Sequence, residues 1–109
     1  MKLQTVLAVT LLSVAISSPA WATKGDAAAG KTKSTTCAAC HGPDGNSLVP
    51  DFPKLAGQQG DYLVHTLKAY KTKARANAIM NGLAATLTDQ DIADLAAYYA
   101  SQKGLSIKR

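Results

Sequence analysis

The residues best suited to carry chemistry in this 109-residue chain are Cys37, Cys40 and His41, which stand together as Cys-Ala-Ala-Cys-His. Two cysteines three positions apart project from the same face of a helix, so both thiols can form thioether bonds to one porphyrin. His41, the next residue along, can then extend over the ring and bind the iron through its Nε2 atom. The pattern therefore predicts one covalently attached c-type haem with His41 as an axial ligand.

Other chemistries use similar residues. A redox-active dithiol of the thioredoxin kind follows a strand in a βαβ unit, and this sequence has no alternating strand pattern. A zinc site needs four ligands, which only Cys37, Cys40, His41 and His65 could supply together. Zinc binding and a simple disulfide between the two cysteines are the alternatives to haem attachment.

Met80 is the best candidate for the second axial position of a haem iron. It is the only methionine after Met1, and it lies in a stretch without helical periodicity. A thioether sulfur is a soft, neutral ligand that raises the reduction potential relative to a second histidine. One alternative is that Met80 fills a gap in the core, and another is that His65 binds the iron. Since His65 falls on the polar face of its predicted helix, an exposed position is favoured for it.

Three helical patterns position these residues. The first runs from residue 27 toward residue 40, the second covers about residues 61–72, and the third begins at residue 88. Each starts at a residue able to cap it, namely Asp26, Asp61 and Thr88. A long loop rich in proline and glycine, residues 42–60, joins the first two helices, and wrapping a cofactor would explain its length. The sequence predicts an all-α domain in which three main helices and a long loop surround the haem.

These segments resemble a bacterial class I cytochrome c, in particular one half of the two-haem periplasmic cytochromes. The likeness is carried by Cys-Ala-Ala-Cys-His-Gly-Pro-Asp-Gly-Asn at 37–46, Pro-Asp-Phe-Pro-Lys-Leu-Ala-Gly-Gln at 50–58, Ile-Met at 79–80, and residues 87–99. The sequence holds one Cys-x-x-Cys-His motif where those proteins carry two. The resemblance implies the small class I cytochrome c fold with His/Met ligation of the iron.

Further roles are implied by the resemblance. It implies that the carbonyl of Pro50 accepts a hydrogen bond from Nδ1–H of His41, which would orient the ring and strengthen it as a ligand. It implies that Gly30 crosses the third helix near Tyr98 or Tyr99. Asn77 would lie near Met80 and could orient its sulfur or a haem propionate.

The first 22 residues have a character of their own. Lys2 gives a positive start, residues 3–16 form an apolar stretch, and Ala20-Trp21-Ala22 fits the small-x-small pattern that signal peptidase accepts. We expect an export signal removed after Ala22, a cytochrome c domain over residues 23–109 located in the periplasm, and no membrane span after signal removal. That domain keeps only 19 bulky apolar side chains, which is few for a free-standing core. A bound haem would supply the missing apolar mass.

With both axial positions filled, the expected function is one-electron transfer between redox partners of a respiratory chain, and not enzymatic catalysis. The formal net charge is +5, and a basic segment precedes Met80. Its members, Lys68, Lys71, Lys73 and Arg75, are expected to dock acidic redox proteins, with Lys31, Lys33 and Lys54 as possible additions.

Three alternatives bear on this function. The basic residues could form a solvated face without a partner. Nucleic acid is a poor partner, because the basic residues lack interleaved aromatic residues. A different function, that of a haem enzyme or ligand sensor of the peroxidase kind, would need an open distal position, for which Arg75 is the one residue that could act beside the haem.

Overall fold

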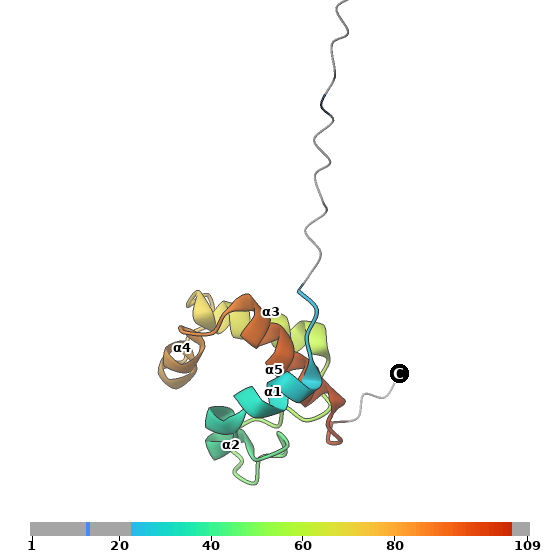
Figure 1. Cartoon of the computed structure of the whole chain (residues 1–109). Coiled ribbons are helices and arrows are strands. Elements are labelled where there is room, and N and C mark those ends of the chain that lie inside the picture. The colour runs from blue at the N-terminus through green and yellow to red at the C-terminus, as the bar shows by residue number, and fades with distance from the viewer. Residues whose placement is uncertain (1–12, 14–22, 106–109) are drawn as a thin grey trace, which may run out of the picture.

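The described residues, Ser13 and 23–105, fold into five α-helices and no β-strand in the computed structural model. The helices are α1 (Ala27–Lys33), α2 (Thr35–His41), α3 (Gly60–Lys71), α4 (Ala78–Ala84) and α5 (Asp89–Ser101), as Figure 1 shows. The prediction of an all-α domain is confirmed. The predicted export signal, residues 1–22, lies outside the described residues apart from Ser13. Within the described part of the chain, no helix has the length and apolar character needed to cross a membrane.

The helix boundaries differ from the predictions on both sides of the long loop. The predicted first helix is two helices, because the chain breaks at Ser34, whose hydroxyl donates a 2.7 Å hydrogen bond to the carbonyl of Lys31. A serine side chain that bonds to nearby backbone competes with helix continuation in this way. Asp61 does not cap α3, which begins one residue earlier, after Gln59; its carboxylate accepts instead from the amide of Tyr62.

The region of Met80 was predicted to lack a helix, and this was wrong. Met80 lies in α4, which Asn77 caps by accepting a 3.0 Å hydrogen bond from the amide of Met80. The predicted start of α5 is confirmed, since Thr88 and Asp91 form a reciprocal capping box.

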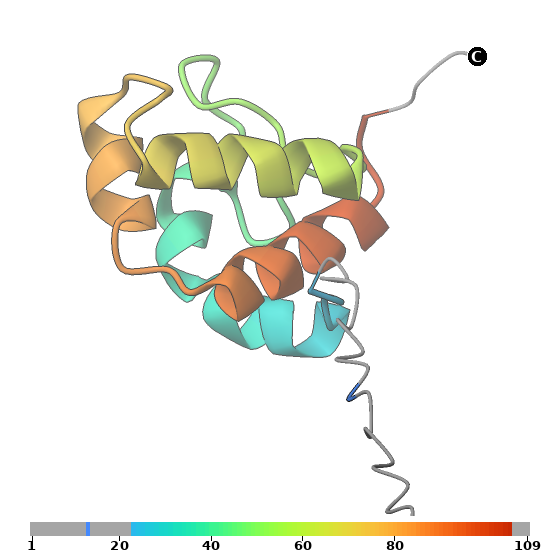
Figure 2. The ribbon, with the colours of Figure 1, turned by 90° about the horizontal axis from the view of Figure 1, so that it is seen from above.

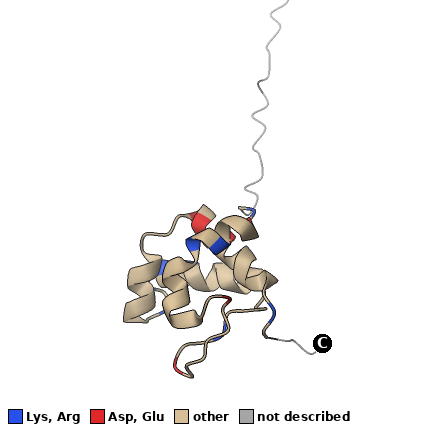
Figure 3. Cartoon of the chain, turned by 60° about the horizontal axis from the view of Figure 1, so that its bottom comes forward, with Lys and Arg blue, Asp and Glu red and all other residues tan. Residues whose placement is uncertain are grey.

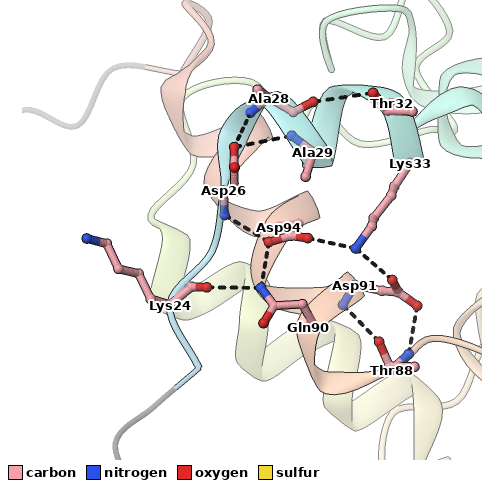
Figure 4. Close-up of polar contacts among 10 residues, drawn as sticks. All are labelled: Lys24, Asp26, Ala28, Ala29, Thr32, Lys33, Thr88, Gln90, Asp91 and Asp94. Carbon is pink, nitrogen blue, oxygen red and sulfur yellow. Dashed lines mark hydrogen bonds and ion pairs between the residues drawn. The ribbon is translucent and has the colours of Figure 1, made fainter.

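Helices α1 and α5 cross closely, and Figure 2 shows them side by side. The crossing requires a residue without a side chain at Gly30, where a Cβ would lie 1.9 Å from the carbonyl oxygen of Asp94 and 2.7 Å from the Cβ of Tyr98. The predicted crossing of Gly30 near Tyr98 is therefore confirmed. Figure 4 shows the polar contacts beside it, in which Lys33 pairs with Asp94 at 2.7 Å and with Asp91 at 2.9 Å.

A small core forms where α3 packs against α5. Its buried members are Leu63, Leu95, Ala96, Tyr98 and Tyr99. Within the long loop, Gly45 adopts a φ of 85°, which favours glycine, and its carbonyl accepts from the amide of Leu55 at 2.8 Å. Gly45 also lies against the core, since a Cβ there would be 2.7 Å from the ring of Tyr99. The amide of Gly57 donates to the carbonyl of Tyr99 at 2.9 Å. The loop is thus held against α5 and returns the chain past the end of α2.

Candidate functional site

The predicted haem residues line one cavity of about 480 Å³. Cys37, Cys40 and His41 reach it from α2, and Met80 reaches it from α4. Its walls are largely apolar side chains of the two longest helices, α3 and α5. These include Leu63, Leu67, Leu95, Ala96 and Tyr99. A mostly apolar cavity of this size with a few polar donors is typical of a small-molecule or cofactor site. The structure therefore brings together the four residues that the sequence analysis selected.

His41 is buried and held by one hydrogen bond. His41 is 7% exposed, and its Nδ1 atom lies 2.8 Å from the carbonyl oxygen of Pro53. Because a carbonyl oxygen only accepts, Nδ1 carries the hydrogen and donates it. In the neutral ring this leaves a lone pair on Nε2, the tautomer that a metal-binding histidine needs.

The prediction that Pro50 accepts this hydrogen bond was wrong. Pro50 is exposed within a turn that the amide of Phe52 closes on the carbonyl of Val49 at 3.1 Å. The chain returns to the imidazole only after this turn, at Pro53. The kind of contact was foreseen, but a loop with several prolines does not reveal from its sequence which carbonyl closes it.

The two cysteines are free thiols on the cavity wall, and both are half-buried. Burial raises the pKa of the Cys37 thiol above its ordinary value. Among the described residues, no three His, Cys, Asp or Glu side chains are grouped so as to hold a metal ion. His65 is exposed, as predicted, and is not part of the cavity wall.

Tyr99 gives an independent view of what the cavity is suited to hold. Its hydroxyl is buried and has no hydrogen-bond partner among the described residues, and burial, followed by the neighbouring Cys37, raises the pKa of Tyr99. Such an orphaned polar atom on a cavity wall is unusual in a protein without a ligand there. Together with two adjacent thiols, a histidine Nε2 and a thioether, the cavity offers the donor set and apolar walls that fit a haem c.

Asn81 is a residue that the sequence analysis missed. Asn77, which it did single out, uses its side chain to cap α4. Asn81 makes more contacts, because its amide nitrogen donates to the carbonyls of Tyr70 and Arg75, both at 2.8 Å. No pattern of spacing marks Asn81, but its place directly after Met80 could have drawn attention to it.

The basic residues selected for docking are exposed but not equally available. The ammonium of Lys71 donates to the carbonyl of Leu87, and the guanidinium of Arg75 lies 5.0 Å from the ring centre of Tyr70. Lys33 is engaged with Asp91 and Asp94. Figure 3 shows basic positions on several elements in this view, not in one stripe.

Comparison with known proteins gives consistent matches. The family model described as cytochrome c matches residues 27–103. Cytochrome c4 of Pseudomonas aeruginosa is 56% identical over 79 residues, covering 72% of this chain and 39% of that protein. Cytochrome c-554(548) of Halomonas halodenitrificans is 51% identical over 82 residues, covering 72% of this chain and 99% of that protein.

A solved structure agrees with these sequence matches. The reduced recombinant cytochrome c4 from Pseudomonas stutzeri has a TM-score of 0.71 and 47% identity, over 74% of this chain and 47% of that one. The predicted class I fold is thereby confirmed. The chain spans less than half of the length of either cytochrome c4 and nearly all of cytochrome c-554(548).

Proposed function

The chain belongs to the cytochrome c family, whose cofactor is a covalently bound haem c, and on this premise we propose that it is a periplasmic one-electron carrier with His/Met ligation. One observation carries the proposal: Cys37, Cys40, His41 and Met80 line a single cavity, and the hydrogen bond to Pro53 leaves Nε2 of His41 free. When bound, the haem supplies an iron that gains and loses one electron.

Each of these residues has a distinct role in the proposal. Cys37 and Cys40 hold the porphyrin through two thioether bonds, so that the cofactor cannot dissociate. His41 would supply its Nε2 atom to the iron, with the ring kept in orientation by the carbonyl of Pro53. Met80 would supply a neutral thioether sulfur to the same iron, a ligand that favours the reduced state. With the same ligands retained in both oxidation states, little rearrangement accompanies electron transfer.

The proposal includes export and docking. The segment before residue 23 acts as a signal peptide cleaved after Ala22, which leaves residues 23–109 as the cytochrome c domain in the periplasm. The domain shuttles electrons between respiratory redox proteins, and acidic partners dock near Lys68, Lys71, Lys73 and Arg75. Arg75 itself lines the cavity, which supports docking of a partner near this residue.

The absorption spectrum of the holoprotein tests the ligation. We expect a low-spin, six-coordinate ferric spectrum with the weak far-red band that marks a sulfur–iron bond. Met80→Ala should abolish this band, because it removes the only methionine of residues 23–109. His65→Ala serves as the control and should leave the spectrum unchanged, since His65 is exposed and outside the cavity wall. A high-spin wild type that binds carbon monoxide rapidly would instead support the haem enzyme or sensor.

Docking is tested by the salt dependence of electron transfer. Lys68→Ala should slow the reaction with an acidic redox protein severalfold at low ionic strength, and the difference should vanish at about 1 M salt, where charges are screened within about 3 Å. Lys103→Ala is the matched control, because Lys103 is an exposed lysine that follows α5 and is not part of the basic segment before Met80. Equal effects of the two substitutions would show that net charge alone, and not a docking site, sets the rate.

A further inference from the structure

The side chain of Asn81, the residue that follows Met80, bonds α4 to the end of α3 and to the connection between α3 and α4. Its Nδ2 atom donates to the carbonyl of Tyr70 and to that of Arg75, each at 2.8 Å, and its Oδ1 atom accepts from the amide of Asn77 at 3.0 Å. Both hydrogens of the amide are therefore used, together with one acceptor site of its oxygen. Asn81 is half-buried, so water competes only in part for these bonds.

The partners of Asn81 are the segments that determine where α4 lies. Tyr70 is in the last turn of α3, while Arg75 and Asn77 belong to the connection from α3 to α4. That connection reverses direction through Lys73, a residue other than glycine with a φ of 64°. This left-handed backbone conformation is unfavourable for a residue with a side chain, so the turn at Lys73 needs surrounding contacts to hold it.

Other contacts reinforce the same turn from the α3 side. The guanidinium of Arg75 stacks over the ring of Tyr70 and donates to the hydroxyl of Tyr62 at 3.4 Å. The amide of Arg75 donates to the carbonyl of Ala69 at 3.1 Å. These contacts fix the turn to α3. Helix α4 also packs on α3, but among the hydrogen bonds of the described residues only those of the Asn81 side chain join α4 to both α3 and the turn.

From this geometry we infer that Asn81 is the positioning residue for Met80. The inference rests on the proposed ligation of iron by Met80. Met80 would bind the iron from a helix of only seven residues. The state that competes with its ligation is therefore one in which α4 and the turn before it move away and another ligand binds the iron. Asn81 disfavours that state, because α4 cannot leave α3 without breaking its bonds to Tyr70 and Arg75.

Imidazole binding to the ferric holoprotein measures this competition directly. Imidazole replaces the methionine sulfur, and its binding is followed by loss of the far-red band. Asn81→Ala should raise the affinity for imidazole about tenfold or more. The reason is that it removes hydrogen bonds that each favour the state with α4 held on α3 by a factor of several. The midpoint potential should fall as the sulfur–iron bond weakens.

Asn46→Ala is the matched control. Asn46 also donates through Nδ2 to a carbonyl, that of Lys103 at 2.8 Å, and to the carboxylate of Asp44 at 2.9 Å, but it lies outside the Met80 region. It should lower thermal stability without changing imidazole affinity. An equal rise in imidazole affinity in Asn46→Ala and Asn81→Ala would overturn the inference, because the effect would then reflect general destabilisation.

Asn81→Asp provides a second variant of nearly the same shape. It retains an acceptor for the amide of Asn77 and replaces the two donations by a carboxylate facing two carbonyls, so imidazole affinity should rise here too. Wild-type imidazole affinity in either Asn81 variant would overturn the inference. A wild-type holoprotein without the far-red band would instead overturn the ligation by Met80, so the two failures are distinguishable.

Discussion

At the scale of single residues, two neighbouring tyrosines on α5 have opposite hydrogen-bond status. The rings of Tyr98 and Tyr99 lie 5.0 Å apart between centroids, and both are buried. The hydroxyl of Tyr98 donates to the carbonyl of Pro43 at 2.8 Å, whereas the hydroxyl of Tyr99 has no partner among the described residues. A buried hydroxyl contributes stability when it is paired and costs stability when it is not.

The two tyrosines should therefore respond differently to loss of the hydroxyl. Tyr98→Phe should lower the free energy of unfolding by about 1 kcal/mol, because a hydrogen bond is lost. Tyr99→Phe should be neutral or should raise it by up to about 1 kcal/mol, because an unpaired polar group leaves the interior. Urea unfolding of the ferric holoproteins measures both values. Equal losses in the two variants would mean that the Tyr99 hydroxyl has a partner once the haem is attached.

Residue types were easier to predict than their contacts. The Cys-x-x-Cys-His motif identified the cysteines and His41 because its spacing is local and specific, and the structure places all three on one cavity wall. The partner of His41 was missed by three positions, since it depends on how the proline-rich loop turns in space. Asn81 was missed because its contacts reach back to α3, which no local pattern encodes.

At the scale of elements, the crossing of α1 and α5 is joined by charged groups beside Gly30. The carboxylate of Asp94 is buried and accepts from Lys33, from Gln90 and from the amide of Asp26 (Figure 4). Lys33 lowers the pKa of the Asp94 carboxyl more than the other contacts do. The backbone amide of Thr88, followed by Lys33, lowers the pKa of Asp91 from 3.8 to about 2.

The lowered pKa of Asp91 predicts that the start of α5, and with it the ion pair to Lys33, is sensitive to acid. A carboxyl group whose pKa is lower in the folded state contributes stability above its unfolded pKa, and that contribution is lost as the pH falls through the folded pKa. Asp91→Asn should therefore be less stable than wild type at pH 7, and the difference should shrink between about pH 4 and pH 2. Thermal unfolding of the ferric holoproteins across this range measures the difference.

Asp89→Asn is the control, because it removes a charge from the same turn of α5 at an exposed position. Its deficit at pH 7 should be smaller than that of Asp91→Asn. A deficit of Asp91→Asn that stays constant down to pH 2 would contradict the role of the charged carboxylate.

Elements with end signals were predicted best. Thr88 and Asp91 predicted the start of α5 correctly, because a capping box is formed by residues close together in the sequence. Helix α4 was missed because a segment of seven residues is too short to show a helical period. A helix of this length is stable only through its packing on α3, which no local pattern reveals. The break at Ser34 was also missed, because one hydroxyl bond to the carbonyl of Lys31 decides it.

At the scale of the whole molecule, the fold is arranged around a cavity more than around a core. Three of its helices, α1, α2 and α4, have seven residues each, a length at which an isolated helix is not stable in water. The side chains that α2 and α4 direct inward meet a cavity of about 480 Å³. Only Ile92 and Leu95 are large side chains that are fully buried among the described residues. The cofactor must therefore supply much of the apolar contact that holds these helices.

This arrangement predicts that the chain without haem lacks a cooperative fold. Cys37→Ala/Cys40→Ala, prepared free of haem, should lose most of its helical circular dichroism and melt without a sharp transition. The matched holoprotein should melt cooperatively, because a ligand bound only to the folded state stabilises that state. The reason is that α2 and α4 would have no apolar surface to pack against across the cavity. A sharp thermal transition in the haem-free variant would show that the pairing of α1, α3 and α5 suffices to fold the chain, and that the haem fills a cavity formed without it.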